Sequence, residues 1–210
     1  MKARVSRAFF FFGAEMLKEL IEHFEAVVEL PIEVEEIALK INDMDLQDEI
    51  YFFPADIDPT EIRGAFRQFR TPTGVYGVSK WVTHIAYSQH LDVEWQRVIC
   101  AKELVHIFDP GVAKTNTEEE VSQLLDKLVG PLSSEDYGFA DLQAAKDRLA
   151  LYQCLPLLLP KAYLEIARNA VDAELKTPED IAQEAVIPLR FVKLMLSDDW
   201  ETLNGALIDL

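Results

Sequence analysis

The chain has few cysteines, few basic residues and no long apolar run. Its 210 residues include two cysteines, Cys100 and Cys154, and no CxxC motif or Cys/His cluster. Neither a disulfide framework nor a cysteine-type structural zinc site is therefore indicated. Both cysteines lie in apolar helical stretches, which favours buried free thiols in a reducing cytoplasm. No stretch reaches the roughly 18 apolar residues of a membrane helix, so we expect no membrane association.

Basic residues are outnumbered, with 20 Lys and Arg against 37 Asp and Glu and a net charge of −17. Such a chain is a poor candidate for nucleic-acid binding, which needs a basic surface to release counterions. The acidic residues are unevenly distributed along the chain, because residues 64–91 contain none but include Arg67, Arg70 and Lys80. We expect this positive region to meet either an acidic partner or the chain's own acidic helices.

The N-terminus carries basic residues followed by the aromatic run 9–12, as a signal peptide would. The run is short, Glu15 interrupts it, and no small-residue cleavage pattern follows. We therefore expect no secretion and a cytoplasmic location. Apolar residues at helical spacing instead predict a helix over 14–29.

Apolar residues make up half of the chain, enough for a sizeable core in one domain. Strand-type composition is found in three segments, 49–57, 64–70 and 80–88. A helix is predicted over 95–108, and the remaining sequence is largely helical. This order predicts the α+β class, with a small antiparallel sheet packed on the 95–108 helix and a largely helical C-terminal half.

The strongest chemical pattern is the stretch VICAKELVHIFDP at 98–110. Its Glu103 and His106 have the spacing of an HExxH helix, in which two histidines bind Zn²⁺ and the glutamate is the general base. Lys102 stands where the first histidine belongs, and an ammonium group repels Zn²⁺. The pattern therefore predicts an altered metal site, beside the simpler interpretation of an ordinary amphipathic helix.

Three blocks in this order resemble the ImmA/IrrE-type metallopeptidases, regulators that cleave phage or stress repressors. HIAYSQHL followed by WQRVICAKELVHIF is similar to the family's strand and RFTLAHELGH helix. DRLALYQCLPLLLPKAYLEIA is similar to its ExxAN…LLMP segment, and LKTPEDIAQEAVIPLRFVKLML to its helical tail, LAxxFxVSxxAVxxRL. The blocks span roughly residues 80–196, and the first 50 residues match nothing in the family.

The resemblance implies a single zincin-like domain over 1–210. Its parts are N-terminal helices in 1–48, the sheet and motif helix in 49–110, helices in 111–170 and a helix-turn-helix-like tail in 171–210. In the tail only Arg190 and Lys193 are placed to meet phosphates, so we expect a packing role rather than DNA binding.

The resemblance also assigns the site. Glu103 falls on the general-base position, His106 on the second zinc ligand and Asp147 on the third, with Glu118 as the alternative third ligand. Lys102 departs from the first ligand position. His84 or His90 could supply a replacement ligand from the preceding strand, although each is simpler to interpret as a strand or turn residue.

A catalytic zinc needs about three protein ligands and an open position for water. Because Lys102 replaces a ligand, we expect a metallopeptidase-like pseudoenzyme with no resident cofactor, in which Lys102 neutralises Glu103 and Asp147. It would act through a protein partner such as a repressor-like regulator, and would have a phage or mobile-element origin. The alternative is an active zinc endopeptidase of the ImmA/IrrE type, which cleaves a repressor with a non-standard ligand set.

Overall fold

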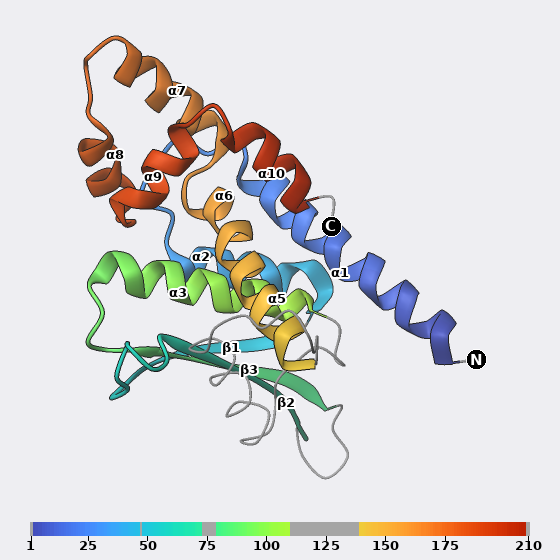
Figure 1. Cartoon of the computed structure of the whole chain (residues 1–210). Coiled ribbons are helices and arrows are strands. Elements are labelled where there is room, and N and C mark those ends of the chain that lie inside the picture. Colours follow the sequence, from blue (N-terminus) through green and yellow to red (C-terminus); the bar gives the residue numbers. More distant parts are fainter. Residues whose placement is uncertain (1, 47, 73–78, 110–138, 209–210) are drawn as a thin grey trace.

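A three-stranded sheet lies beneath a layer of helices in the computed structural model of the chain (Figure 1). The structure describes residues 2–46, 48–72, 79–109 and 139–208. The elements in chain order are α1 (Lys2–Phe24), α2 (Val34–Ile41), the π-helical turn η1 (Asn42–Leu46), β1 (Asp48–Ala55), β2 (Gly64–Thr71), β3 (Lys80–Ser88), α3 (Val93–Val105), the 3₁₀ turn η2 (His106–Phe108), α5 (Phe139–Gln153), α6 (Leu155–Leu158), α7 (Lys161–Asp172), α8 (Pro178–Ala185), α9 (Leu189–Leu196) and α10 (Trp200–Ile208).

The sheet has the strand order β1-β3-β2. Strand β2 pairs with β3 antiparallel, whereas β1 pairs with β3 parallel. The α+β class and the helical C-terminal half are confirmed, but the prediction of a wholly antiparallel sheet was wrong for β1. The connection 56–63 reverses the chain, so β2 runs opposite to β1 but does not pair with it. After a second reversal β3 lies between the two strands, and it therefore runs in the same direction as β1.

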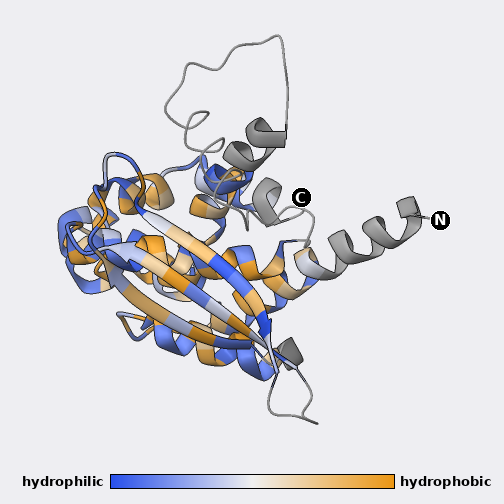
Figure 2. Cartoon of the chain, turned by 90° about the horizontal axis from the view of Figure 1, so that it is seen from below, coloured by the Kyte–Doolittle hydropathy of each residue, from blue (hydrophilic) through white to orange (hydrophobic). Residues whose placement is uncertain are grey.

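The two faces of the sheet differ, because successive side chains of a strand point to opposite faces. The inner face supplies Phe52, Phe66 and the fully buried Ile85 to the core. The outer face carries no helix from the described part of the chain (Figure 2). On it Tyr51 and Phe53 are 46% and 43% exposed.

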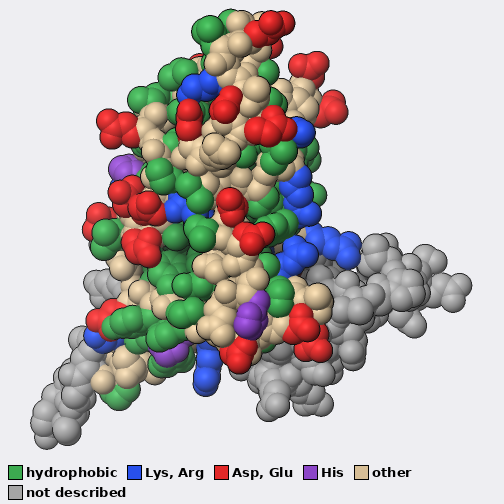
Figure 3. Space-filling model, turned by 90° about the vertical axis from the view of Figure 1, so that its left-hand side faces the viewer, with side chains coloured by type: hydrophobic (Ala, Val, Ile, Leu, Met, Phe, Trp, Pro, Cys, Tyr) green, Lys and Arg blue, Asp and Glu red, His purple; other side chains and the backbone are tan. Residues whose placement is uncertain are grey.

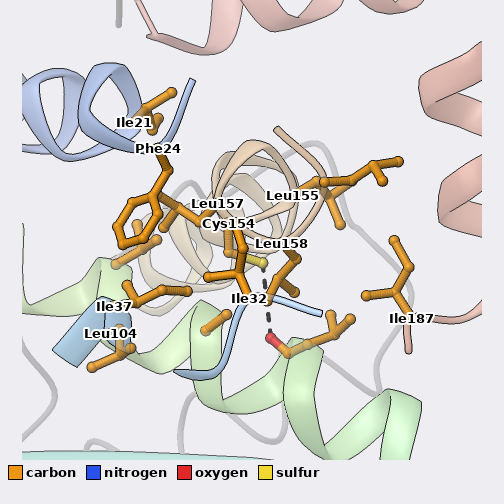
Figure 4. Packing of buried hydrophobic residues seen from close by; sticks show 14 of the residues in the cluster. Ile21, Phe24, Ile32, Ile37, Leu104, Cys154, Leu155, Leu157, Leu158 and Ile187 are labelled. Atoms are coloured by element: carbon orange, nitrogen blue, oxygen red, sulfur yellow. Dashed lines mark hydrogen bonds between the residues drawn. The ribbon is translucent and has the colours of Figure 1, made fainter. Parts of the chain in front are cut away.

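Much of the core lies among the helices (Figure 4), and the inner face of the sheet packs against it. Leu20, Ile37, Leu104 and Leu158 come from four different helices and are all fully buried. Each such side chain stabilises the fold by roughly 1.5–3 kcal/mol through removal from water. The short helix α6 follows a break after Gln153 and ends before Pro160, as the prolines in this segment predict.

Helix α3 is the central element, and all its residues from 97 to 105 are buried. As predicted, the helix continues through η2 to Phe108 and turns Cys100 and Leu104 into the core. A helix enclosed on every side must also bury its polar side chains, and these then need partners. Arg97 finds them in the carboxylate of Glu33 and the carbonyl oxygen of Ile32, both at 2.6 Å.

The tail contains the short helices α8 and α9, which pack against the rest of the molecule, and ends in α10. A capping box at Thr177 opens α8, and Val186 adopts a left-handed conformation between α8 and α9. Phe191 of α9 is buried and its ring meets Trp95 of α3 edge-on, with centroids 5.5 Å apart. Lys193 pairs with Glu179 at 3.2 Å. Helix α9 therefore has the packing role that we expected.

The two cysteine thiols are buried and free, as predicted. Burial raises the pKa of both thiols to about 12. Among the described residues, no helix is both long enough and apolar enough to cross a bilayer.

Candidate functional site

Four of the predicted site residues lie together between α3 and α5. Lys102 and Glu103 occupy the last turn of α3, His106 opens η2, and Asp147 comes from α5. The ammonium of Lys102 lies 2.9 Å from Glu103 Oε1 and donates a hydrogen bond to Asp147 Oδ1. His106 Nε2 lies 3.5 Å from the same oxygen of Asp147. The expected ion pairs of Lys102 with both carboxylates are therefore confirmed.

Two further residues extend this cluster, and the sequence interpretation missed both. His106 Nδ1 lies 2.9 Å from Asp109 Oδ2, and Lys146 Nζ lies 3.8 Å from Asp109 Oδ1. Asp109 could have been found from its spacing three residues after His106. Lys146 has no comparable signal in the sequence.

The six side chains form a series in which the sign of the charge alternates from one contact to the next. We call this series the charge chain, and its order is Glu103, Lys102, Asp147, His106, Asp109 and Lys146. With His106 protonated the charges sum to zero. Each interior member contacts two neighbours of opposite sign, which is the arrangement that buried charges require.

Lys102 is the most enclosed cation of the charge chain, with its side chain 8% exposed. Burial by itself would lower the pKa of this ammonium group. The negative charges of Glu103 and Asp147 outweigh that effect and raise the pKa of Lys102 well above its ordinary value. Lys102 therefore keeps its proton, and its nitrogen has no lone pair for a metal or a substrate.

His106 is also a cation at neutral pH. Burial opposes its charge, but the hydrogen bonds to Asp109 and Asp147 raise the pKa of His106 to about 9. For Asp147, burial would raise the pKa of the carboxyl group. The contacts with His106 and Lys102 instead hold the pKa of Asp147 well below its usual range. Both residues are therefore charged across the physiological pH range.

Zinc does not fit this set of donors. A zinc-binding histidine must be neutral, because the metal takes the lone pair that a proton would occupy. In the charge chain His106 is protonated, and the ammonium of Lys102 stands at the first ligand position. Within residues 2–46, 48–72, 79–109 and 139–208, no group of three or more His, Cys, Asp or Glu side chains is arranged to hold a metal ion.

The proposed replacement ligands lie elsewhere. The ring of His84 lies on the outer face of the sheet, 4.9 Å from that of Phe53 and 5.0 Å from that of Phe69. His90 pairs with Asp56 at 2.7 Å. Neither histidine joins the charge chain, which agrees with the simpler interpretation of each as a strand or turn residue. Glu118, the alternative third ligand, falls outside the described residues.

Glu103 is closed off by the sheet. Its side chain is 4% exposed, and a Cβ added to Gly64 would lie only 2.9 Å from its Oε1 and 2.3 Å from Ile99 Cγ2. The absence of a side chain at Gly64 is what lets β2 approach α3 so closely. A general base must reach water and substrate. The β2 backbone instead covers this carboxylate.

A small cavity lies near the other end of the charge chain. Its volume is about 90 Å³, and its lining includes Leu17 of α1, Phe108, Asp109 and Lys146. Lys102, Glu103, His106 and Asp147 do not line it. The cavity therefore does not give a substrate access to the buried end of the charge chain.

Comparison with known proteins gives no family assignment. No protein-family model, no curated protein and no solved structure gives a significant match to the chain. The resemblance to ImmA/IrrE-type metallopeptidases therefore stays a prediction, supported by the order of the sequence blocks and compatible with the convergence of Lys102, Glu103, His106 and Asp147.

Proposed function

We propose that this chain is a metallopeptidase-like regulatory protein with a metal-free site, and that it acts through a protein partner rather than by cleaving peptides. The observation that carries the proposal is the position of the Lys102 ammonium, which is buried between Glu103 and Asp147. In the HExxH frame this position belongs to a metal ligand. Here it holds a permanent positive charge.

Electrostatics explains why a cation is needed there. Carboxylates that converge in a buried site repel one another, and one of them becomes protonated unless a positive charge separates them. A metal ion would supply that charge reversibly. Lys102 supplies it through a covalent side chain, so the charge balance of the site does not depend on metal supply. On this proposal the charge chain fixes α3 against α5 and has no chemical step to perform.

The enclosure of Glu103 supports an inactive site. Hydrolysis at an HExxH site requires the glutamate to take a proton from a water molecule held beside the scissile bond. The carboxylate of Glu103 is covered by β2 and paired with Lys102. It is therefore unsuited to that role in the described conformation.

The partner class follows from the resemblance to regulators that recognise repressors. We propose a repressor-like protein as the partner and a phage or mobile element as the origin of the chain. A peptidase scaffold that has lost its chemistry can keep its recognition surface, because fold and active site are separable. The net charge of −17 favours a protein partner over a nucleic acid.

An active zinc endopeptidase is the second candidate. The convergence of Glu103, His106 and Asp147 favours it, since these residues fall on the base and two ligand positions. For this candidate Lys102 would have to leave both carboxylates, and His106 would have to lose a proton that its pKa of about 9 retains.

Metal analysis distinguishes the two candidates. Protein purified without added metal is expected to contain far less than one equivalent of zinc by mass spectrometry, and to leave casein intact with or without added zinc. Stoichiometric zinc that a chelator removes, together with casein cleavage that Glu103→Gln abolishes, would establish the endopeptidase and overturn the proposal.

A further inference from the structure

Two arginines from distant parts of the chain lie over one tryptophan. The guanidinium carbon of Arg63 is 4.7 Å from the ring centre of Trp95, and that of Arg190 is 4.2 Å away. Arg63 comes just before β2, Trp95 lies in the first turn of α3, and Arg190 lies in the first turn of α9. Each contact is a cation–π interaction, in which the negative face of the ring attracts the positive charge.

Neither guanidinium group pairs with a carboxylate in the part of the chain that the structure describes. By contrast, Arg97 and Arg168 pair with Glu33 and Glu201. Burial and the neighbouring charge of Arg63 lower the pKa of Arg190. Two cations are thus held near one another with no carboxylate partner in the described ranges, in a chain whose net charge is −17.

Helical spacing places a third arginine on the side of α5 that carries Tyr152. Tyr152 of α5 lies close enough to Arg190 to influence its charge. Arg148 is one helical turn before Tyr152 and therefore on the same face of α5. It is exposed and, among the described residues, has no carboxylate partner. Figure 3, which views the end of the molecule where α3 and α9 begin, shows basic side chains gathered along one flank. We call Arg63, Arg148 and Arg190 the arginine patch.

We infer that the arginine patch, with Trp95 beneath it, is the docking surface for an acidic segment of the protein partner; this inference rests on the proposed function. A carboxylate placed between Arg63 and Arg190 would accept charge-assisted hydrogen bonds from both and relieve their repulsion. Arginine and tryptophan are the residue types that contribute most at protein interfaces. Burial of Trp95 under an incoming peptide would add apolar contact.

Charge complementarity selects a short acidic peptide over a nucleic acid. A long polyanion would run beyond the arginine patch onto a surface with an excess of acidic residues, and like charges there would repel it. A peptide with a few glutamates engages the arginine patch alone. The flexible side chains of glutamate can also reach two guanidinium groups that stack on a single ring.

The test uses the full chain and a fluorescein-labelled hexaglutamate peptide at low ionic strength, with fluorescence polarisation as the readout. We expect saturable binding that weakens with added salt. The double variant Arg63→Gln/Arg190→Gln is expected to bind about tenfold more weakly, as the loss of two partly exposed charge contacts predicts. The matched control Arg67→Gln/Arg70→Gln changes the net charge equally and should bind within about twofold of the wild type.

A third variant separates a loss of binding from a loss of stability. Arg148 makes no ring contact in the described structure, so Arg148→Gln should leave the melting temperature unchanged and still weaken binding by about two- to threefold. Failure of the wild type to bind, or equal weakening in the control pair, would overturn the docking surface. Tighter binding of an oligothymidylate with the same arginine dependence would replace the acidic peptide by a nucleic acid.

Failure of the docking surface and failure of the proposed function are distinguishable in the same experiment. The hexaglutamate probe is recovered after the titration and its mass is measured. Intact probe agrees with a site that does not cleave peptides. Zinc-dependent cleavage would overturn the metal-free proposal, whereas the arginine dependence of binding would still decide the docking surface.

Discussion

Lys102 and Asp147 share a hydrogen bond across 45 positions of the chain. The contact joins the last turn of α3 to α5, and it places an ammonium group where the HExxH frame has a metal ligand. Because Lys102 also pairs with Glu103, one cation contacts two carboxylates. Whether Lys102 stays paired with both carboxylates therefore distinguishes a structural site from a catalytic one.

Loss of the Lys102 charge should destabilise the fold. Lys102→Ala is expected to lower the free energy of unfolding by about 3–5 kcal/mol, because it leaves the buried carboxylate of Glu103 without its cation and leaves Asp147 with His106 alone. Urea denaturation measures the change. The exposed pair of Lys80 with Glu49 supplies the control, and Lys80→Ala should lower the same quantity by less than about 1 kcal/mol. A small effect at Lys102 would show that the carboxylates find other partners.

The stability of the protein should fall as the pH rises through the titration of His106. In the folded state the pKa of His106 is about 9, above its ordinary value of 6.5. The folded state therefore holds the proton more tightly, and unfolding releases it between these values. The resulting stabilisation, on the order of a few kcal/mol, is complete below about pH 6.5 and is lost as the pH passes 9.

Urea denaturation at several pH values between 6 and 10 tests this dependence. His106→Gln is expected to remove most of the decline over that range, whereas His90→Gln, at an exposed pair with Asp56, should leave it in place. An equal decline in wild type and His106→Gln would mean that another group titrates.

A histidine at position 102, the first ligand position of the HExxH motif, should create a zinc site. Lys102→His gives the sequence HELVH, and with Asp147 in place it supplies three donors. Zinc binding measured by calorimetry should appear in this variant and weaken at acid pH as the histidines protonate. The double variant Lys102→His/His106→Ala is the control and should bind far more weakly. If Lys102→His binds no zinc, the charge chain does not preserve the geometry of a peptidase centre.

Gly64 should not tolerate a side chain. In Gly64→Ala the new Cβ would lie 2.3 Å from Ile99 Cγ2 and 2.9 Å from Glu103 Oε1, so β2 or α3 must shift. We expect the free energy of unfolding to fall by about 1–3 kcal/mol. Gly205 in α10 has nothing within 4 Å of an added Cβ. Gly205→Ala should therefore raise stability slightly through helix propensity. Equal effects at both positions would contradict the close approach of β2.

Much of the fold and part of the site could be predicted from the sequence. The helix that carries Lys102 could be predicted from its apolar residues, and the Leu-rich block after Asp147 set the register of the resemblance in α5. The parallel pairing of β1 could not be predicted, because it depends on the path of the connection 56–63 rather than on either strand. Likewise, Lys146 and Asp109 meet only once α5 has packed on η2.

The arginine patch could not be predicted from the sequence either. The sequence indicated a basic region at 64–91, yet Arg63 lies just before it, and Arg148 and Arg190 are far from it in the chain. Arg63 and Arg190 come together over Trp95 only through tertiary packing. Patterns within one segment of the sequence do not predict such contacts between distant segments.

The alternation of charges along the charge chain constrains how these positions can evolve. A single replacement at either end of the pair formed by Lys102 and Glu103 leaves a buried charge unmatched. Simultaneous replacement of both by apolar residues of similar size leaves the rest of the charge chain balanced and can be neutral or stabilising. Descendant sequences should therefore keep both residues or lose both together. A lineage that has acquired the lysine would reach a metal centre again only through intermediates less stable than either end state.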